Sequence, residues 1–217
     1  MSNLQLRIIS ALVMLPFVVG AVFMGGMPFM IFTGVIFVLA VYEWVRLSFK
    51  TQSKVGFLLF GLIYLPLCFY EFYYLRTGFS DGLYLVISML LVIWSADIGA
   101  YFVGRKFGSH KMAPTMSPNK SWEGLAGAMF FSALMMIVLM KYVFTSDSSP
   151  SLLILALTGA ILGYVGQAGD LLESFLKRKA GEKDSSKLIP GHGGVLDRVD
   201  SILLVSPIFV FIAAYVL

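Results

Sequence analysis

The sequence has a single cysteine, Cys68, and only 13% of its 217 residues are charged. One cysteine excludes an intrachain disulfide framework and a metal cluster built from several thiolates. The scarcity of charge, together with 59% hydrophobic residues and a mean hydropathy of +0.87, excludes a soluble domain, in which about half of the residues are apolar. The chain also lacks the internal repeat typical of inverted-repeat transporters and the phosphate-binding pattern G-x-x-x-x-G-K-[ST].

Long apolar runs are what the sequence has instead. A helix that crosses about 30 Å of hydrocarbon needs roughly twenty such residues. Seven runs approach or reach this length: Ile8–Met24, Pro28–Val45, Val55–Tyr74, Gly82–Val103, Gly124–Phe144, Leu152–Leu172 and Val199–Leu217. The pattern predicts an all-α integral membrane protein, a polytopic bundle of about seven transmembrane helices that forms one membrane domain over residues 1–217.

The basic residues are distributed unevenly between the two sides of this predicted bundle. If the N-terminus is cytoplasmic, fourteen of the sixteen Lys and Arg residues lie on the cytoplasmic side, and only Arg76 and Lys141 lie outside. This asymmetry follows the positive-inside rule, so we expect a cytoplasmic N-terminus and two long polar loops on the cytoplasmic face. The net charge of +4 then belongs to one membrane surface, and we expect no nucleic-acid partner. Topology alone accounts for Arg46, Lys50 and Lys54.

The acidic residues differ in their expected depth in the membrane. Glu43, Glu71, Asp81 and Asp147 lie at span ends or in short loops, where solvation accounts for them. Asp97 lies instead in the later half of an apolar run. An acidic side chain within a span is costly and usually functional, so Asp97 is a candidate site residue. The structural alternative is a hydrogen bond or ion pair with a neighbouring helix.

Polar side chains follow one face of the helix predicted near the end of the sixth run. Asp170, Glu173, Ser174 and Lys177 are spaced i, i+3, i+4 and i+7, which places two carboxylates, a hydroxyl and an ammonium on one face. Arg178 lies to one side of that face. The structural alternative for Asp170 is an ion pair with a buried Lys or Arg.

Two further carboxylates, Asp197 and Asp200, open the last run, with Arg198 between them. Taken alone, each is explained as a helix cap that the helix dipole favours. Together with Asp170 they suggest an oxygen-lined site for Mg²⁺ shared with substrate phosphates.

A glycine-rich turn, Pro190-Gly191-His192-Gly193-Gly194, lies between these helix ends. Its glycines permit positive φ angles and a concave set of backbone amides that suits phosphate oxygens, although a flexible connector has the same composition. His192 is either a phosphate donor or a turn residue. Lys183, Asp184 and Lys187, from the same charged tract, are further candidates for substrate binding.

The other long polar loop contains Ser117-Pro118-Asn119-Lys120-Ser121-Trp122-Glu123-Gly124. Ser121 fits a helix N-cap, which is the structural alternative to a role in substrate binding. Lys120, immediately before that helix N-terminus, is well placed to hold an anionic group. Trp122 fits an aromatic anchor at the membrane interface.

The tract SFLKRKAGEKDSSKLIPGHGGVLDRVD, residues 174–200, closely resembles the signature of the phosphatidate cytidylyltransferases, the CDP-diacylglycerol synthases. The segments SPNKSWEG, DIGAYFVGRKFG and GDLLES are also similar to that family, so the likeness covers residues 96–201, the expected catalytic region. Ser121 departs from the family's more frequent threonine but keeps the hydroxyl. The resemblance implies transfer of CMP from CTP to phosphatidic acid, giving CDP-diacylglycerol and pyrophosphate, with Mg²⁺ required.

The resemblance also implies roles for individual residues. The metal ligands would be Asp170, Asp197 and Asp200, with Asp97 and Glu173 supporting the same polar cavity. The side chains that neutralise the phosphates would be Lys177, Arg178, Lys183, Lys187 and Arg198. No protein nucleophile is needed, because the lipid phosphate can attack the α-phosphorus of CTP directly. Asp170, Asp197, Lys177 and Arg198 are therefore the expected catalytic residues.

The implied setting is the lipid bilayer of a bacterial inner membrane, with the active site at the cytoplasmic face and a homodimer as the assembly. Two alternatives stay open. Seven spans with acidic residues also suit a membrane transporter, although no acid is predicted in the outer half of a span. The second alternative is a CTP-dependent enzyme that acts on a different lipid, since nothing in the spans specifies acyl chains.

Overall fold

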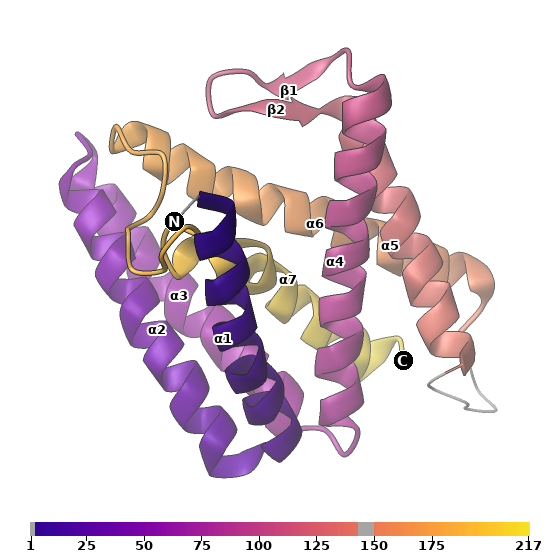
Figure 1. Cartoon of the computed structure of the whole chain (residues 1–217). Helices are drawn as coiled ribbons and strands as arrows, with labels where there is room; N and C mark the ends of the chain where they lie inside the picture. Colours follow the sequence, from indigo (N-terminus) through magenta and orange to yellow (C-terminus); the bar gives the residue numbers. More distant parts are fainter. Residues whose placement is uncertain (1–2, 143–149) are drawn as a thin grey trace. The chain divides into compact units, whose positions relative to one another are not determined.

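The computed structural model describes residues 3–142 and 150–217, so Asp147 and the Phe144 end of the fifth predicted run lie outside the described residues. Within these ranges, seven helices are long and apolar enough to cross a membrane (Figure 1). They are α1 (Asn3–Met24), α2 (Gly26–Phe49), α3 (Lys54–Thr77), α4 (Gly82–Phe107), α5 (Trp122–Tyr142), α6 (Leu152–Lys179) and α7 (Leu196–Tyr215). The prediction of an all-α polytopic membrane protein is confirmed.

The helices are apolar around most of their circumference, because lipid and neighbouring helices are equally apolar surroundings. Large side chains such as Phe17, Leu62 and Ile63 are about two-thirds exposed or more in the isolated chain, at 68%, 71% and 70%. A helix satisfies its own backbone hydrogen bonds, so such a surface is stable in hydrocarbon. The chain is therefore a multi-pass membrane protein.

The helices belong to two compact units. Unit 1 comprises Met1–Leu83 with Leu172–Asp200, and unit 2 comprises Tyr84–Leu171 with Ser201–Leu217. The chain passes from one unit to the other three times: near the start of α4, within α6 and within α7. The single domain expected over residues 1–217 stays a prediction.

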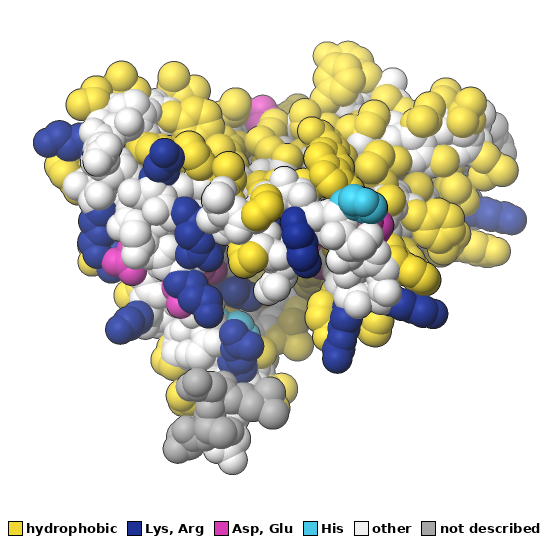
Figure 2. Space-filling model, turned by 90° about the horizontal axis from the view of Figure 1, so that it is seen from above, with side chains coloured by type: hydrophobic (Ala, Val, Ile, Leu, Met, Phe, Trp, Pro, Cys, Tyr) yellow, Lys and Arg dark blue, Asp and Glu magenta, His cyan; other side chains and the backbone are white. Residues whose placement is uncertain are grey.

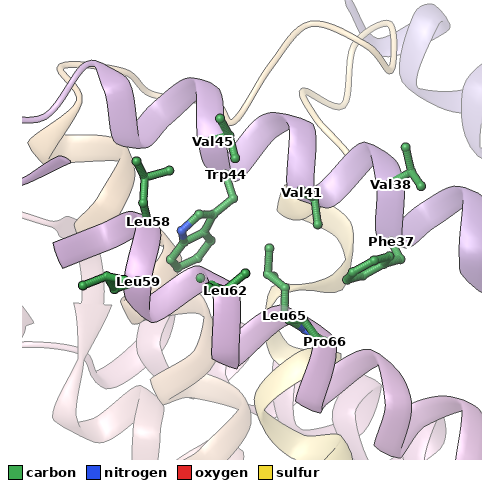
Figure 3. A pocket seen from close by; sticks show the side chains of 11 residues that line it. Phe37, Val38, Val41, Trp44, Val45, Leu58, Leu59, Leu62, Leu65 and Pro66 are labelled. Carbon is green, nitrogen blue, oxygen red and sulfur yellow. The ribbon is translucent and has the colours of Figure 1, made fainter. Parts of the chain in front are cut away.

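In unit 1, α2 packs along α3 through an aromatic contact. The Trp44 ring lies 5.7 Å from the Tyr64 ring, and its Nε1 donates a hydrogen bond of 2.8 Å to the Phe57 carbonyl. An apolar cavity of about 440 Å³ lies beside this contact (Figure 3). Its lining residues are Phe37, Val38, Val41, Trp44, Val45, Leu58, Leu59, Gly61, Leu62, Leu65 and Pro66.

In unit 2, α4 and α5 approach closely where two glycines meet. A Cβ on Gly99 would lie 2.6 Å from the carbonyl oxygen of Gly127, so only glycine permits this approach. A hairpin of β1 (Lys111–Ala113) and β2 (Ser117–Ser121) joins the two helices, with Lys111 opposite Ser121. These strands were not predicted from the sequence, because they are short and lack alternating apolar residues.

Candidate functional site

The charged tract begins inside a helix. Helix α6 continues to Lys179, seven residues beyond the apolar run that predicted it. Glu173, Ser174 and Lys177 are therefore on the helix, as their spacing predicts, and all three are buried. We call the following segment, residues 180–195, the signature loop; it returns the chain to the first turn of α7.

Lys177 joins α6 to the start of α7. Its Nζ lies 2.6 Å from Oδ1 of Asp197 and 3.1 Å from Oε1 of Glu173. The three side chains are 9%, 6% and 4% exposed respectively. One buried ammonium is thus shared by two buried carboxylates, an arrangement that is stable only when the charges stay paired.

The second oxygen of Asp197 is bound by the signature loop. Oδ2 accepts hydrogen bonds from the backbone N–H of Ser185 at 2.8 Å, the Ser185 hydroxyl at 2.9 Å and the backbone N–H of Gly194 at 2.8 Å. Asp197 lies in the first turn of α7, where the helix dipole favours a carboxylate. Its bond from Gly194, which precedes the helix, ties the loop to that turn but is not a helix cap, because a cap accepts from an N–H inside the first turn. The contacts with Ser185 and Lys177 go further, because they join the loop and two helices at one carboxylate.

Glu43 is a central residue that the sequence analysis missed. We expected solvation at a span end to account for it, and this was wrong: Glu43 is 0% exposed. Its oxygens accept hydrogen bonds from the hydroxyls of Ser185 and Ser186 and from the backbone N–H groups of Val195 and Leu196. The only signal in the sequence was an acid within an otherwise apolar run.

The basic residues at the end of α2 also contact the signature loop. Arg46 donates to the Ser185 carbonyl, and Lys50 forms an ion pair with Glu182. The hydrogen bond and the positive charge of Lys50 lower the pKa of Glu182. The prediction that topology alone accounts for Arg46 and Lys50 was therefore incomplete.

Helix α1 supports the glycine turn from another side, and Figure 1 shows its N-terminal end beside the loop. Arg7 Nε donates to the Gly191 carbonyl at 2.7 Å, and Ser10 Oγ lies 2.6 Å from His192 Nδ1. Gly191 has a φ of 76°, which favours glycine. Partial burial, with the positive charges of Arg198 and Arg7, lowers the pKa of His192 below its ordinary value of 6.5, so folding favours the neutral ring.

Unit 2 contains a second polar cluster. Lys120 Nζ lies 2.7 Å from Oδ2 of Asp170 and donates to the Gln167 carbonyl at 3.1 Å. Gln167 Nε2 in turn donates to Oδ1 of Asp97 at 3.1 Å. The structural alternatives considered for Asp97 and Asp170 are thus observed: one accepts a hydrogen bond from another helix, and the other pairs with a lysine.

Ser121 has the structural role that its position predicted. It is buried, and its Oγ accepts a hydrogen bond of 3.1 Å from the backbone N–H of Gly124, which caps α5. Its role in substrate binding stays a prediction. Trp122, the next residue, is 57% exposed, as an anchor at the membrane interface requires.

The remaining candidate residues of unit 1 differ in their exposure. Asp200 and Gly193 are half-buried, and Gly194 is buried. The exposed candidates of unit 1 are Arg178, Lys183, Asp184, Lys187, Gly191 and Arg198. Figure 2 shows many basic and few acidic side chains on one face, beside broad areas of hydrophobic side chains.

A magnesium ion fits the donor chemistry of unit 1. Both oxygens of Glu173 are buried and accept no hydrogen bond from the described part of the chain, although Lys177 lies within ion-pair distance. Two carboxylates that share one ammonium leave negative charge for a hard cation. Within residues 3–142 and 150–217, no three Asp, Glu, His or Cys side chains are already arranged as a metal cluster. Asp170 belongs to unit 2 and Asp197 to unit 1, so their sharing of one ion stays a prediction.

The fold and site define a class: a multi-pass membrane protein whose buried acid–lysine cluster and glycine turn suit phosphate and metal chemistry. The sequence profile of the cytidylyltransferase family matches residues 47–216, and the chain belongs to this family.

Relatives described as phosphatidate cytidylyltransferase include proteins from Staphylococcus haemolyticus and Bacillus subtilis, which are 40% identical over 173 residues and 42% identical over 164. Each match covers 76% of this chain, but only 64% and 60% of the relative's length. A Pseudomonas aeruginosa protein of the same description is 35% identical over 261 aligned positions, covering 95% of both chains.

Proposed function

We propose that this chain is an enzyme that transfers CMP from CTP to phosphatidic acid, giving CDP-diacylglycerol and pyrophosphate. The observation that carries the proposal is the buried contact of Lys177 with Asp197, held by the signature loop within the segment that matches the cytidylyltransferase family. Relatives described as phosphatidate cytidylyltransferase support phosphatidate as the acceptor, and the membrane helices suit a lipid substrate.

The proposed reaction is a direct displacement at phosphorus. A phosphate oxygen of phosphatidic acid forms a bond to the α-phosphorus of CTP, and the bond from that phosphorus to the oxygen bridging to the β-phosphate breaks. Pyrophosphate leaves with the bonding electrons. Such a step needs alignment and charge stabilisation more than a protein nucleophile.

The basic side chains around the cluster would bind the phosphates. Arg178, Lys183, Lys187 and Arg198 are exposed and can meet a soluble nucleotide. Lys177 is buried between carboxylates, so we assign it to positioning Asp197 as well as to phosphate contact. The backbone amides of Gly191, Gly193 and Gly194 would add uncharged donors for phosphate oxygens.

Asp197 and Glu173, with Asp200 and Asp170, are the residues that would hold Mg²⁺, and Asp97 would support them. When bound, this ion would neutralise negative charge on the reacting phosphates. We further propose that the site faces the cytoplasm of a bacterial inner membrane, because fourteen of the sixteen basic residues lie on the side that carries both polar loops. The homodimer that the resemblance implies is part of the same proposal.

Two radiolabels distinguish this reaction from other uses of CTP. Purified protein in liposomes that contain phosphatidic acid would receive Mg²⁺ and CTP labelled at the α- or the γ-phosphorus. We expect the α-label in the lipid fraction and the γ-label in pyrophosphate, in equal amounts. A γ-label in the lipid would instead indicate a CTP-dependent lipid kinase. Liposomes with diacylglycerol in place of phosphatidic acid are the control for the acceptor.

A further inference from the structure

Glu43 lies on α2 and outside the segment that matches the family profile, which begins at residue 47. It is nevertheless fully buried against the signature loop. We propose that Glu43 is a positioning residue that fixes this loop so that Asp197 meets Lys177. The inference rests on the proposed function for its consequence in catalysis, but its structural part is independent of the substrate.

The two oxygens of Glu43 join both ends of one stretch of chain. Oε1 accepts from the Ser186 hydroxyl and from the Val195 N–H at 3.0 Å. Oε2 accepts from the Ser185 hydroxyl at 2.9 Å and from the Leu196 N–H at 2.8 Å. The stretch from residue 185 to residue 196 is therefore closed by a single side chain from a distant helix.

Ser185 connects Glu43 to the proposed catalytic carboxylate. Its Oγ lies 2.9 Å from Oε2 of Glu43 and 2.9 Å from Oδ2 of Asp197. One hydroxyl proton can serve only one of these oxygens at a time, but the Ser185 N–H also donates to Asp197 at 2.8 Å. A continuous path of contacts thus runs from Glu43 through Ser185 to Asp197 and Lys177.

The space between these groups admits no further side chain. A Cβ on Gly194 would lie 2.0 Å from Ser185 Oγ and 2.5 Å from Oε1 of Glu43. The last glycine of the turn therefore allows the loop backbone to approach Glu43. The loop conformation is determined by acceptors on α2 as well as by its own glycines.

The substitution Glu43→Gln tests this arrangement with little change in volume. Whichever way the amide is turned, its NH₂ group faces the N–H of Val195 or of Leu196, and neither can act as an acceptor. The serine hydroxyls can rotate, but the backbone donor cannot. A buried donor is then left without a partner, which is costly enough to release the loop.

The experiment measures exposure of the loop in the purified full chain in detergent micelles. Trypsin cleaves after Lys183 and Lys187, which are exposed residues of the signature loop, and mass spectrometry gives the rate at each site. We expect Glu43→Gln to raise these rates by at least about tenfold, the factor expected for one unsatisfied buried group. Glu71→Gln, the same change on α3, is the matched control and should leave them within about twofold.

A second readout separates positioning of Asp197 from general loosening. The Mg²⁺ concentration that gives half-maximal CMP transfer should rise about tenfold in Glu43→Gln and stay unchanged in Glu71→Gln. Cleavage of Glu43→Gln at the control rate would overturn the proposal.

If Glu43→Gln loses helix content, a double variant, Ser185→Ala/Ser186→Ala, decides the question, because it removes two donors to Glu43 without altering α2. Unchanged cleavage of this double variant would also overturn the proposal. Faster cleavage in a protein that transfers no CMP would retain the role of Glu43 and reject the proposed function.

Discussion

The ammonium of Lys177 lies 2.6 Å from Oδ1 of Asp197, twenty residues further along the chain, and both side chains are less than one-tenth exposed. This contact brings the end of α6 to the start of α7 across the signature loop.

Lys177→Ala should weaken both activity and stability. The substitution leaves the buried carboxylates of Asp197 and Glu173 without their shared ammonium, which typically costs about 3 to 5 kcal/mol. We expect a lower thermal midpoint in detergent and a kcat/KM for CMP transfer reduced by at least about tenfold. Lys179→Ala is the matched control, because Lys179 is exposed on the same helix turn. Unchanged kinetics for both CTP and phosphatidic acid would show that Lys177 serves only the topology of the chain in the membrane.

The pair of Lys120 and Asp170 should be coupled energetically. A double-mutant cycle with Lys120→Met and Asp170→Asn, read out by thermal unfolding of the purified protein, isolates their interaction. Because the ion pair is 2.7 Å long and Lys120 is only 14% exposed, we expect a coupling energy of about 0.5 to 3 kcal/mol. The control cycle uses Lys111→Met in place of Lys120→Met, because Lys111 is an exposed residue of the same hairpin. Additive effects in the first cycle would contradict the pairing.

Acid pH should weaken the contact between α1 and the glycine turn. The pKa of His192 is lowered in the folded protein, so folding favours the neutral ring. Its contribution to stability is present above the unfolded pKa and is lost as the pH falls through the lowered folded value. Trypsin cleavage of the signature loop, measured relative to an unfolded substrate at the same pH, should therefore accelerate as the pH falls below about 6.5. His192→Asn, which cannot titrate, should flatten this dependence; an identical acid response in both proteins would exclude His192 as its source.

Much of the fold could be predicted from composition, because a span needs only length and hydrophobicity. All seven apolar runs became helices, and α6 extended further because its polar face continues at helical spacing. The hairpin between α4 and α5 could not be predicted, since its short polar strands carry no alternation.

The candidate site was predicted unevenly. Asp197 and Lys177 stood out because they lie in a dense charged tract. Glu43, Arg46 and Lys50 did not, because each lies more than 130 residues from its partner in the signature loop, and one sequence gives no information about such pairs. A span-end position predicts solvation only if no other segment covers it, and here the signature loop does.

Both polar loops should face the cytoplasm. Single cysteines at Lys111 and Lys183, in a Cys68→Ser background, should resist a membrane-impermeant thiol reagent in intact cells and react after the membrane is opened. Both positions are exposed, so protection would come from the membrane rather than from burial in the protein. A cysteine at Asp81, in the link between α3 and α4, is the control that should react from outside. Labelling of Lys183→Cys from outside would contradict the topology.

The most direct test of the central claim is CMP transfer by Asp197→Asn and Asp170→Asn proteins at limiting Mg²⁺. Asparagine keeps the size of aspartate but removes the charge that a hard cation requires. At position 197 its one carbonyl oxygen can still accept from Ser185 and Gly194, while its NH₂ group no longer pairs with Lys177, which keeps Glu173 as a partner. We predict that each variant inserts and folds, loses nearly all transfer of the α-label to lipid, and that the double variant is little worse than either single one, since residues that act as a unit are non-additive. Near-normal turnover by well-folded Asp197→Asn protein would contradict the account.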